Sequence, residues 1–307
     1  MVALRLHQIT WLAEGVVRLE LTDPRGGAAL PSWEPGAHLS LHLPNGQIRE
    51  YSLCGDPADG RAYAVAVQRD ERSRGGSAHV HERLRVGDLI EVDGPKNNFA
   101  LVDAPSYLLV AGGIGITPIK TMAEALEAAG KDWRLFYCGR SRDRMAFADG
   151  FGDRVTLHCD DEAGSPPDLA AVIARAPADA LVYCCGPEPL IQAVERALDD
   201  PARLRVERFR APEQPRGSAA EAPFTVVCRD RRFTVEPGKS ILETLRANGL
   251  DAPSSCEEGI CGTCETRVLG GEPDHRDFLL TDAEKAAGTS MMLCVSRART
   301  PELVLDL

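Results

Sequence analysis

Four cysteines near the C-terminus constrain the fold of this 307-residue chain more than any other feature. Cys256, Cys261 and Cys264 form a C-x4-C-x2-C pattern, and Cys294 follows further along the chain. A cluster of two irons needs four thiolate ligands, and one tight loop can supply three of them. Two glycines inside the loop let its backbone curl so that amide groups point at sulfur. The spacing therefore predicts a [2Fe–2S] cluster held by these four cysteines.

A structural zinc site is the alternative use of four cysteines. Zinc sites usually combine two short C-x2-C pairs, whereas this chain has one such pair. The surrounding segment also favours the cluster, because residues 223–307 read as a small α+β domain of the β-grasp type. Its expected elements are two strands, a helix with a capping box in its first turn, and a final strand, at Phe224–Cys228, Arg232–Val235, Ser240 with Glu243, and Glu302–Leu307.

Two further segments precede this domain. Residues 1–103 alternate short strand runs with Gly, Pro and Asn turns, which predicts an antiparallel β-barrel or, as the alternative, a sandwich. Residues 104–210 alternate strands with helices, which predicts an α/β domain with a parallel sheet covered on both faces. Residues 211–222 are rich in Pro, Ala and polar residues, as is typical of a linker. The sequence therefore predicts a multidomain chain with domains at 1–103, 104–210 and 223–307.

Two pieces of the first domain predict a flavin site. Arg49, Tyr51 and Ser52 lie together on a strand, where the guanidinium can hold a phosphate and the ring and hydroxyl can contact an isoalloxazine. In the second piece, two glycines precede an expected helix and can present backbone amides to an anion; its residues are Gly75, Gly76, Ser77 and Ala78. Alone, each piece is compatible with a surface salt bridge or a plain turn. Together, ahead of a nucleotide domain, they predict a bound flavin.

A glycine-rich turn in the second domain predicts a dinucleotide site. It lies between a buried strand and an expected helix over Thr117–Ala129, and it contains Gly112, Gly113, Gly115, Thr117 and Pro118. The glycines allow a pyrophosphate to approach the helix N-terminus, and proline is tolerated in the first helical turn. Because the pattern is G-x-G-x-x-P, a tight strand–helix turn without a ligand remains the alternative.

A thiol follows another predicted strand of this domain. Cys185, Gly186 and Pro187 lie at the carboxyl edge, where parallel sheets bind ligands. We therefore predict that Cys185 acts at the nicotinamide, whereas Cys184 is expected to be an inert buried thiol.

Charged residues bear on the choice of nucleotide. Asp160 and Asp161 follow a third strand run, where carboxylates can bind ribose hydroxyls and repel a 2′-phosphate, which favours NADH. Arg140 and Arg142 follow yet another strand run and could bind that phosphate, so NADPH stays open as the alternative.

Composition excludes several classes of function. With 46 acidic and 35 basic residues the net charge is −11, which argues against a nucleic-acid partner. The chain lacks an apolar run of the ~20 residues that a membrane helix needs, and its N-terminus lacks the core of a signal peptide. We expect a cytoplasmic protein that is a monomer, since no long apolar heptad is present.

These motifs combine into one expected activity. Hydride from NADH carries two electrons at once, whereas a [2Fe–2S] cluster accepts one, and a flavin can exchange either number. The chain is therefore expected to be an NADH-dependent reductase that passes electrons from nicotinamide through flavin and cluster to a partner protein.

The same residues resemble the phthalate dioxygenase reductase group of the ferredoxin–NADP reductase superfamily, and vanillate demethylase reductases look similar. The resemblance spans nearly the whole chain, including its domain order, and is carried by residues 49–54, 75–77, 112–118, 183–187, 253–256, 274–277 and 294–298. It implies FMN as the flavin and a Rieske-type aromatic oxygenase as the partner.

The resemblance also implies flavin contacts. It implies that Ala66, Val67 and Gln68 line the ring, that Thr117 joins the FMN contacts, and that Phe209 lies against the flavin. Gln68 departs from the lysine expected in relatives. Two alternatives remain: a reductase for another oxygenase, such as a diiron hydroxylase, and a redox-sensing protein without turnover. Reductases of diiron hydroxylases typically place the ferredoxin unit first and use FAD, so the C-terminal position here argues against that alternative.

Overall fold

Buried and exposed residues alternate along the first strands, which pair into a six-stranded antiparallel sheet of order β4-β3-β6-β1-β2-β5. Leu53, just beyond β4, bridges to Val65 of β5, so the sheet closes into a barrel. Leucine and valine side chains fill its interior, and Val80 of the helix α1 packs against them. The elements are β1 (Val2–Ala13), β2 (Val16–Thr22), β3 (Ala37–His42), β4 (Ile48–Ser52), β5 (Ala62–Gln68), α1 (Gly76–Glu82) and β6 (Leu89–Asn97).

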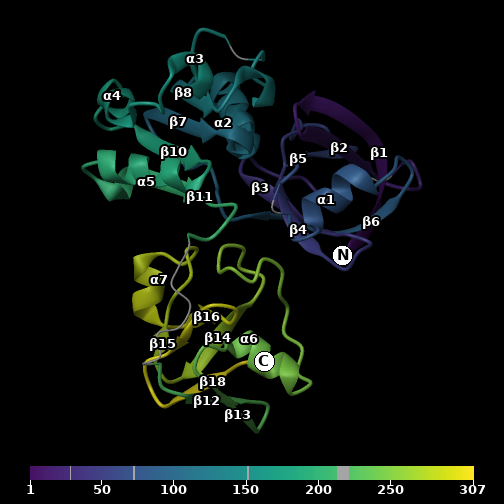
Figure 1. The fold of residues 1–307 in the computed structure, drawn as a ribbon, viewed down its shortest axis with the longest axis vertical. Coiled ribbons are helices and arrows are strands. Elements are labelled where there is room, and N and C mark those ends of the chain that lie inside the picture. Colours follow the sequence, from purple (N-terminus) through teal and green to yellow (C-terminus); the bar gives the residue numbers. More distant parts are fainter. Residues whose placement is uncertain (28, 72, 151, 213–220) are drawn as a thin grey trace. The chain divides into compact units, whose positions relative to one another are not determined.

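A parallel five-stranded sheet follows, with the order β11-β10-β7-β8-β9. Every residue of β7 is buried, because helices cover both faces: α2 packs on one, and α4 and α5 pack on the other (Figure 1). The elements are β7 (Ser106–Gly112), η1 (Gly113–Gly115), α2 (Ile116–Ala128), β8 (Asp132–Gly139), η2 (Arg142–Arg144), β9 (Val155–Cys159), α3 (Asp160–Ala163), α4 (Leu169–Ala174), β10 (Leu181–Cys185), α5 (Glu188–Ala197), η3 (Pro201–Arg203) and β11 (Leu204–Glu207).

The C-terminal part builds a mixed five-stranded sheet of order β13-β12-β18-β14-β16, beside a two-stranded β15–β17 pair. β12 and β18 run parallel, and α6 contributes Ile241, Leu242 and Leu245 to the core. The elements are β12 (Phe224–Cys228), β13 (Arg231–Val235), α6 (Ile241–Ala247), β14 (Glu265–Gly270), β15 (Pro273–Asp274), α7 (Asp282–Ala287), β16 (Ser290–Met292), β17 (Arg297–Ala298) and β18 (Glu302–Leu305).

The computed structural model describes residues 1–27, 29–71, 73–150, 152–212 and 221–307, in two units, Met1–Phe209 and Arg210–Leu307. The barrel, the parallel sheet and the C-terminal α+β sheet confirm the predicted fold class. Because barrel and parallel sheet belong to one unit, the predicted domain limits remain predictions. Most of the predicted linker, at 213–220, lies outside the described residues.

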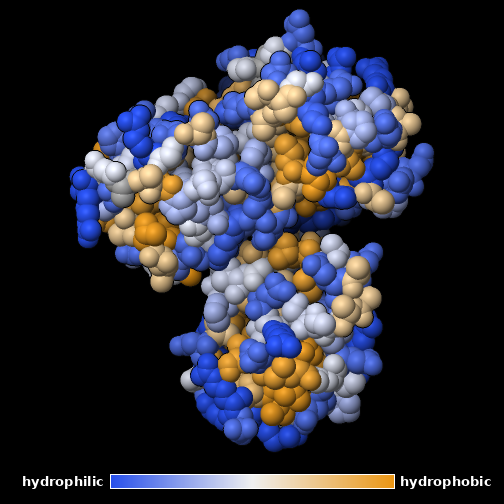
Figure 2. Space-filling view, turned by 180° about the vertical axis from the view of Figure 1, so that it is seen from behind, coloured by the Kyte–Doolittle hydropathy of each residue, from blue (hydrophilic) through white to orange (hydrophobic). Residues whose placement is uncertain are grey.

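Hydrophilic residues cover most of the surface visible in Figure 2, with apolar areas between them. Among the described residues, no helix combines the length and the apolar character that crossing a membrane requires. Three large hydrophobic residues within strands are well exposed: Trp11 of β1 at 70%, and Leu89 of β6 and Leu269 of β14 at 55% each.

Candidate functional site

The structure brings the four predicted cluster cysteines together. Cys261 and Cys264 are buried and Cys256 is half-buried, and all three lie on the loop between α6 and β14. Cys294 is also buried and directly follows β16, which pairs with β14. Leu293 donates its backbone N–H to the carbonyl of Cys264 at 3.3 Å. The strand pairing therefore delivers the fourth thiol to the loop that carries the other three.

The loop is shaped by glycine and anchored to α6. Gly259 has a φ of 75°, and a Cβ there would lie 2.6 Å from Val295 Cγ2, so no other residue fits without movement. Glu257 also has a positive φ, 57°, and Arg246 of α6 donates to its carboxylate at 3.0 Å. Arg246 also donates to Ser254 Oγ at 2.8 Å. These contacts hold the loop in the curled form that the sequence predicts.

The electrostatics of the loop favour metal binding. Contacts with Cys261 and then Cys294 lower the pKa of Cys256, and a contact with Cys294 lowers the pKa of Cys264. Contacts with Cys256 and Cys264 raise the pKa of Cys294. The amide of Glu258 also donates to Cys256 Sγ at 3.3 Å. These contacts place three thiols within hydrogen-bonding range of one another, and iron binding displaces thiol protons.

The two predicted flavin pieces lie against each other in the barrel. A Cβ on Gly76 would lie 2.6 Å from Arg49 Nε and 2.8 Å from its Cγ, so the arginine rests directly on the glycine backbone. Gly75 has a φ of 98° and accepts a hydrogen bond from Asn45 at 3.0 Å. The structure therefore joins residues 49 and 75–76 into one polar cradle, in which the absence of a side chain at Gly76 makes room for the guanidinium.

The remaining residues predicted to contact the flavin lie on β4, β5, α1 and α2. Tyr51 packs on the barrel core, and burial raises its pKa to about 12. Ser77 uses its hydroxyl locally, accepting from the amide of Asp70 at 3.1 Å. The other predicted contacts are placed as follows: Ala66 and Val67 are buried in β5, Gln68 is exposed at its end, Ala78 is half-buried in α1, and Thr117 is buried in α2 and donates to the carbonyl of Ile114.

The glycine-rich turn and the Cys185 strand end meet at the edge of the parallel sheet. A Cβ on Gly115 would lie 2.2 Å from the carbonyl oxygen of Cys185, and a Cβ on Gly112 would lie 2.7 Å from Pro187 Cδ. Gly186 is equally confined, with Gly112 Cα 3.0 Å from the position of its Cβ. The three glycines are therefore needed for the close approach of η1 to β10, independently of any nucleotide bound at this edge.

The paired cysteines point to opposite faces of the sheet. Cys184 belongs to the core under α4 and α5, as expected for an inert thiol, and Cys185 belongs to the core under α2. Burial raises the pKa of Cys185 well above its usual range, so this thiol stays protonated. Phe209, in contrast, is 38% exposed just beyond β11.

Sequence reasoning missed one carboxylate at this site, Glu207. It ends β11, a four-residue edge strand that the sequence pattern did not predict, and its Oε2 accepts from Ser52 Oγ at 3.2 Å. Cys185 Sγ lies 4.0 Å from the same oxygen. The alternation in Leu204-Arg205-Val206-Glu207 was the available signal. Glu207 thus joins the barrel to the carboxyl edge of the parallel sheet.

The predicted ribose-binding carboxylate lies at a second part of that edge. Asp160 is the first residue of α3, and its Oδ1 is 3.3 Å from Nε2 of His158. The neighbouring Asp161 donates its backbone N–H to the carbonyl of Arg140 at 3.1 Å. The ends of β8 and β9 are therefore in contact, and both the acidic and the basic candidates for nucleotide selection lie there.

Known proteins match the chain over its full length. Residues 224–299 match the family model of the 2Fe-2S iron-sulfur cluster binding domain. Phenoxybenzoate dioxygenase subunit beta from Ectopseudomonas oleovorans is 48% identical over 314 residues, which covers 100% of this chain and 97% of the relative. The solved structure of phthalate dioxygenase reductase is 40% identical with a TM-score of 0.73, covering 100% of this chain and 98% of that one. The chain belongs to the phthalate dioxygenase reductase family.

Family membership confirms the expected enzyme class and cofactors. The chain is an oxidoreductase of a family that uses FMN, NADH and a [2Fe–2S] cluster and works with oxygenases. The four converging thiols fit the cluster, and the Arg49–Gly76 cradle fits an anionic phosphate. The match of residues 224–299 to the model of a 2Fe-2S domain argues against the alternative of a structural zinc site.

A second solved structure places the same architecture inside a larger enzyme. An intact type IV self-sufficient cytochrome P450 monooxygenase is 41% identical to this reductase, with a TM-score of 0.92 over 99% of the chain. The chain spans 41% of the length of that monooxygenase.

Glu207 gives this reductase a testable pH dependence. Burial raises the pKa of Glu207 to about 8; the hydrogen bond from Ser52 opposes this rise and the charge of Glu50 adds to it. In the unfolded chain Glu207 ionises at its ordinary pKa of 4.5. The free energy of unfolding therefore falls as the pH rises from that value to about 8, and it falls no further above pH 8. We expect Glu207→Gln to remove this loss, roughly 2–4 kcal/mol at pH 8 after allowance for partial exposure. Thermal unfolding of both forms between pH 5 and 9 measures the difference.

Glu50→Gln supplies the control: it removes a charge that raises the pKa of Glu207, so the loss should end at a lower pH and be smaller than in the wild type without vanishing. Parallel stability curves for the wild type and Glu207→Gln would show that the carboxyl is ionised in the folded state at neutral pH.

Proposed function

We propose that this reductase passes electrons from NADH through FMN and its [2Fe–2S] cluster to a Rieske-type aromatic oxygenase. The observation that carries the proposal is that one chain holds both a glycine-rich edge of a parallel sheet and a loop whose three cysteines meet a fourth, Cys294. Hydride enters as an electron pair, and when bound the flavin lets that pair leave as single electrons. The proposed domains are those expected from the sequence, at 1–103, 104–210 and 223–307.

The barrel residues are proposed to hold FMN. Arg49, supported on Gly76, provides a guanidinium for the phosphate, and Tyr51 and Ser52 lie further along the same strand. Ser52 is oriented by its hydrogen bond to Glu207. Because burial raises the pKa of Glu207 to about 8, its carboxyl favours the neutral form at pH 7 and places little negative charge beside the region where the flavin and the nicotinamide would meet.

The edge of the parallel sheet is proposed to hold NADH. Gly112, Gly113 and Gly115 leave the start of α2 open to a pyrophosphate, and Cys185 and Gly186 form the neighbouring strand end. The Cys185 thiol is protonated and neutral, which suits contact with an uncharged dihydronicotinamide. Phe209, exposed beyond β11, supplies an aromatic ring for the flavin side.

Asp160 is proposed to select NADH over NADPH. Asp160→Asn removes the charge that accepts ribose hydroxyls and repels a 2′-phosphate. We expect the KM for NADH to rise about tenfold, equivalent to about 1.4 kcal/mol, and the preference for NADH over NADPH to fall. Steady-state kinetics with both nucleotides measures this.

Asp161→Asn is the matched control, because the Asp161 carboxylate accepts from the amide of Glu162 and should leave nucleotide preference unchanged. A larger effect at residue 161 than at residue 160 would reassign the ribose contact.

The oxygenase partner is tested by reconstitution. The purified reductase, with NADH and a Rieske-type oxygenase for an aromatic substrate, should support product formation coupled to NADH oxidation.

Electron transfer to a cytochrome P450 is the second candidate function, because the same architecture forms part of a self-sufficient P450 monooxygenase. Coupled turnover with a haem monooxygenase and none with several Rieske-type oxygenases would favour that candidate.

A further inference from the structure

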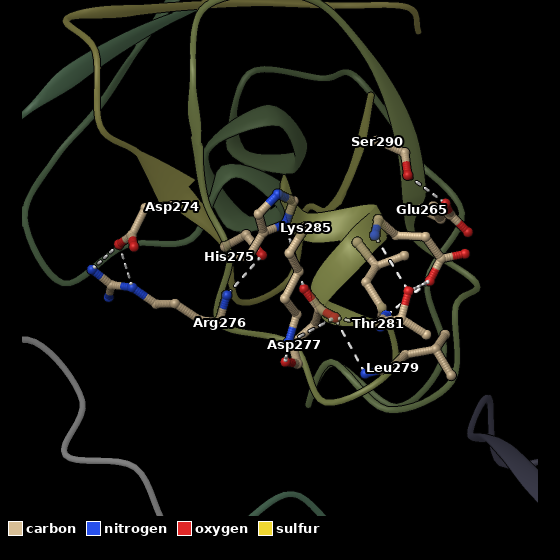
Figure 3. A network of polar contacts seen from close by, with 12 residues as sticks. Glu265, Asp274, His275, Arg276, Asp277, Leu279, Thr281, Lys285 and Ser290 are labelled. Carbon is tan, nitrogen blue, oxygen red and sulfur yellow. Dashed lines mark hydrogen bonds and ion pairs between the residues drawn. The ribbon is translucent and has the colours of Figure 1, made fainter. Parts of the chain in front are cut away.

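A buried histidine without a hydrogen-bond partner lies in the C-terminal unit. His275 is the sole histidine in residues 210–307, and its side chain is 5% exposed. Neither ring nitrogen has a partner among the described residues, and Nδ1 lies 3.7 Å from Oδ1 of Asp277, which also lacks one (Figure 3). Buried polar atoms without a hydrogen-bond partner are rare in folded proteins, so this facing pair calls for an explanation.

Asp277 is fixed in place by its own contacts. Its side chain is fully buried, and Oδ2 accepts from the amides of Leu279 at 3.2 Å and Leu280 at 2.8 Å. Lys285 of α7 donates to the carbonyl of Asp277 at 2.8 Å, with its Nζ 3.9 Å from Oδ2 (Figure 3). One carboxylate oxygen is therefore satisfied, and the other is directed at His275.

The His275–Asp277 segment packs directly behind the cysteine loop. Phe278 donates its backbone N–H to the carbonyl of Gly259, at 3.0 Å, in the middle of that loop. A Cβ on Gly259 would lie 3.2 Å from Asp277 Cα. A charge that develops among the four cysteines is therefore close to this segment and separated from it by protein, where electrostatic coupling is stronger than in water.

The fixed charges around His275 balance one another. Asp277 faces Lys285, while Arg276 pairs with Asp274 at 2.8 Å and with Glu221 at 2.6 Å. On the neighbouring strand β17, Arg297 pairs with Glu221 at 3.4 Å. Three acids thus face three bases. The charge on the cluster, which becomes more negative by one unit when an electron arrives, is then the variable charge near this segment.

We propose that His275 is a redox-linked proton site. For each electron delivered to the cluster, the imidazole takes up one proton from solvent, forming an N–H bond at Nε2 while Nδ1–H faces Asp277. When the electron leaves for the partner, the proton returns to solvent. The proton on His275 offsets the charge of the electron on the cluster, and His275 itself does not touch the reacting atoms. The proposal rests on the cluster of the family and is independent of the proposed nucleotide and oxygenase.

The test is a redox titration of the cluster in the whole protein. Dithionite with mediators sets the potential, and the paramagnetic signal of the reduced cluster is followed across the pH range in which an imidazole titrates. Uptake of one proton per electron makes each tenfold change in proton concentration shift the reduction potential by about 59 mV. His275→Asn places a non-titrating amide beside Asp277, so its potential should not vary with pH over that range. His7→Asn, at an exposed position of β1, should keep the wild-type slope.

A second variant keeps the proposal testable if residue 275 proves necessary for cluster assembly. Lys285→Met removes the cation beside Asp277, which should favour the imidazolium and move the sloping region to higher pH. A wild-type potential that does not change with pH would overturn the proposal, as would an unchanged slope in His275→Asn. Since no nucleotide or oxygenase is added, failure here is distinguishable from failure of the proposed function.

Discussion

Replacing Cys264 with alanine is expected to abolish electron export while leaving the flavin reducible by NADH. Cys264 is 4% exposed; its thiol contacts both the thiol and the backbone of Cys294, and its carbonyl accepts from the amide of Leu293. Without this thiolate the cluster keeps three ligands. Because losing even an outer partner of a metal site costs about 10- to 100-fold, we expect a loss of cytochrome c reduction beyond about 100-fold. Acid-labile sulfide and the visible spectrum report cluster loss, and bleaching of the flavin by NADH reports the retained half-reaction.

Cys228→Ala is the matched control for this variant. Cys228 is equally buried in the same unit, on β12, but belongs to the hydrophobic core and not to the cysteine loop. Its replacement should cost about 1 kcal/mol of stability and keep both cluster and electron export. Full sulfide content in Cys264→Ala, or its loss in Cys228→Ala, would contradict the ligand assignment.

Features set by neighbouring residues were predictable from the sequence. The C-x4-C-x2-C spacing, with glycines inside the loop, specifies a curled segment before any tertiary contact is known. The capping box at Ser240 and Glu243 is present with both of its hydrogen bonds, and the helix predicted over Thr117–Ala129 is α2 with its ends shifted by one residue. In these cases the signal lies within one or two helical turns, where sequence patterns are strongest.

Contacts between distant segments were not predictable in the same way. Glu207 meets Ser52 across 155 residues of sequence, and no spacing rule links an edge strand to the end of a barrel strand. The capping box at Thr281, which begins α7, was equally readable but was not recognised, and Lys285 of that helix reaches Asp277 behind the cysteine loop. The sequence does not show which of these local segments face each other in the fold. Burial and pKa shifts depend on that arrangement, so they could not be predicted either.

Gly115→Ala is expected to disrupt the nucleotide edge through steric conflict alone. Gly115 has a φ of −61°, which alanine adopts readily, yet its Cβ would lie 2.2 Å from the oxygen and 2.4 Å from the carbon of the Cys185 carbonyl. Both atoms are backbone, so β10 and η1 must separate. Overpacking of this kind costs about 1–3 kcal/mol, and the displaced turn should raise the KM for NADH at least about tenfold. Thermal unfolding, NADH kinetics and flavin content measure the three effects separately.

Gly130→Ala separates this local conflict from a general loss of stability. Gly130 lies in the same unit just beyond α2, with a φ of 65° and no atom within 4 Å of an added Cβ. Alanine there is strained by about 1 kcal/mol through its backbone, because the left-handed region disfavours a side chain, and it crowds nothing. We therefore expect a modest loss of stability with unchanged NADH kinetics. If Gly115→Ala lowered stability but kept the wild-type KM, the turn at 112–118 would be a packing device for β10 and the nucleotide would bind elsewhere along the sheet edge.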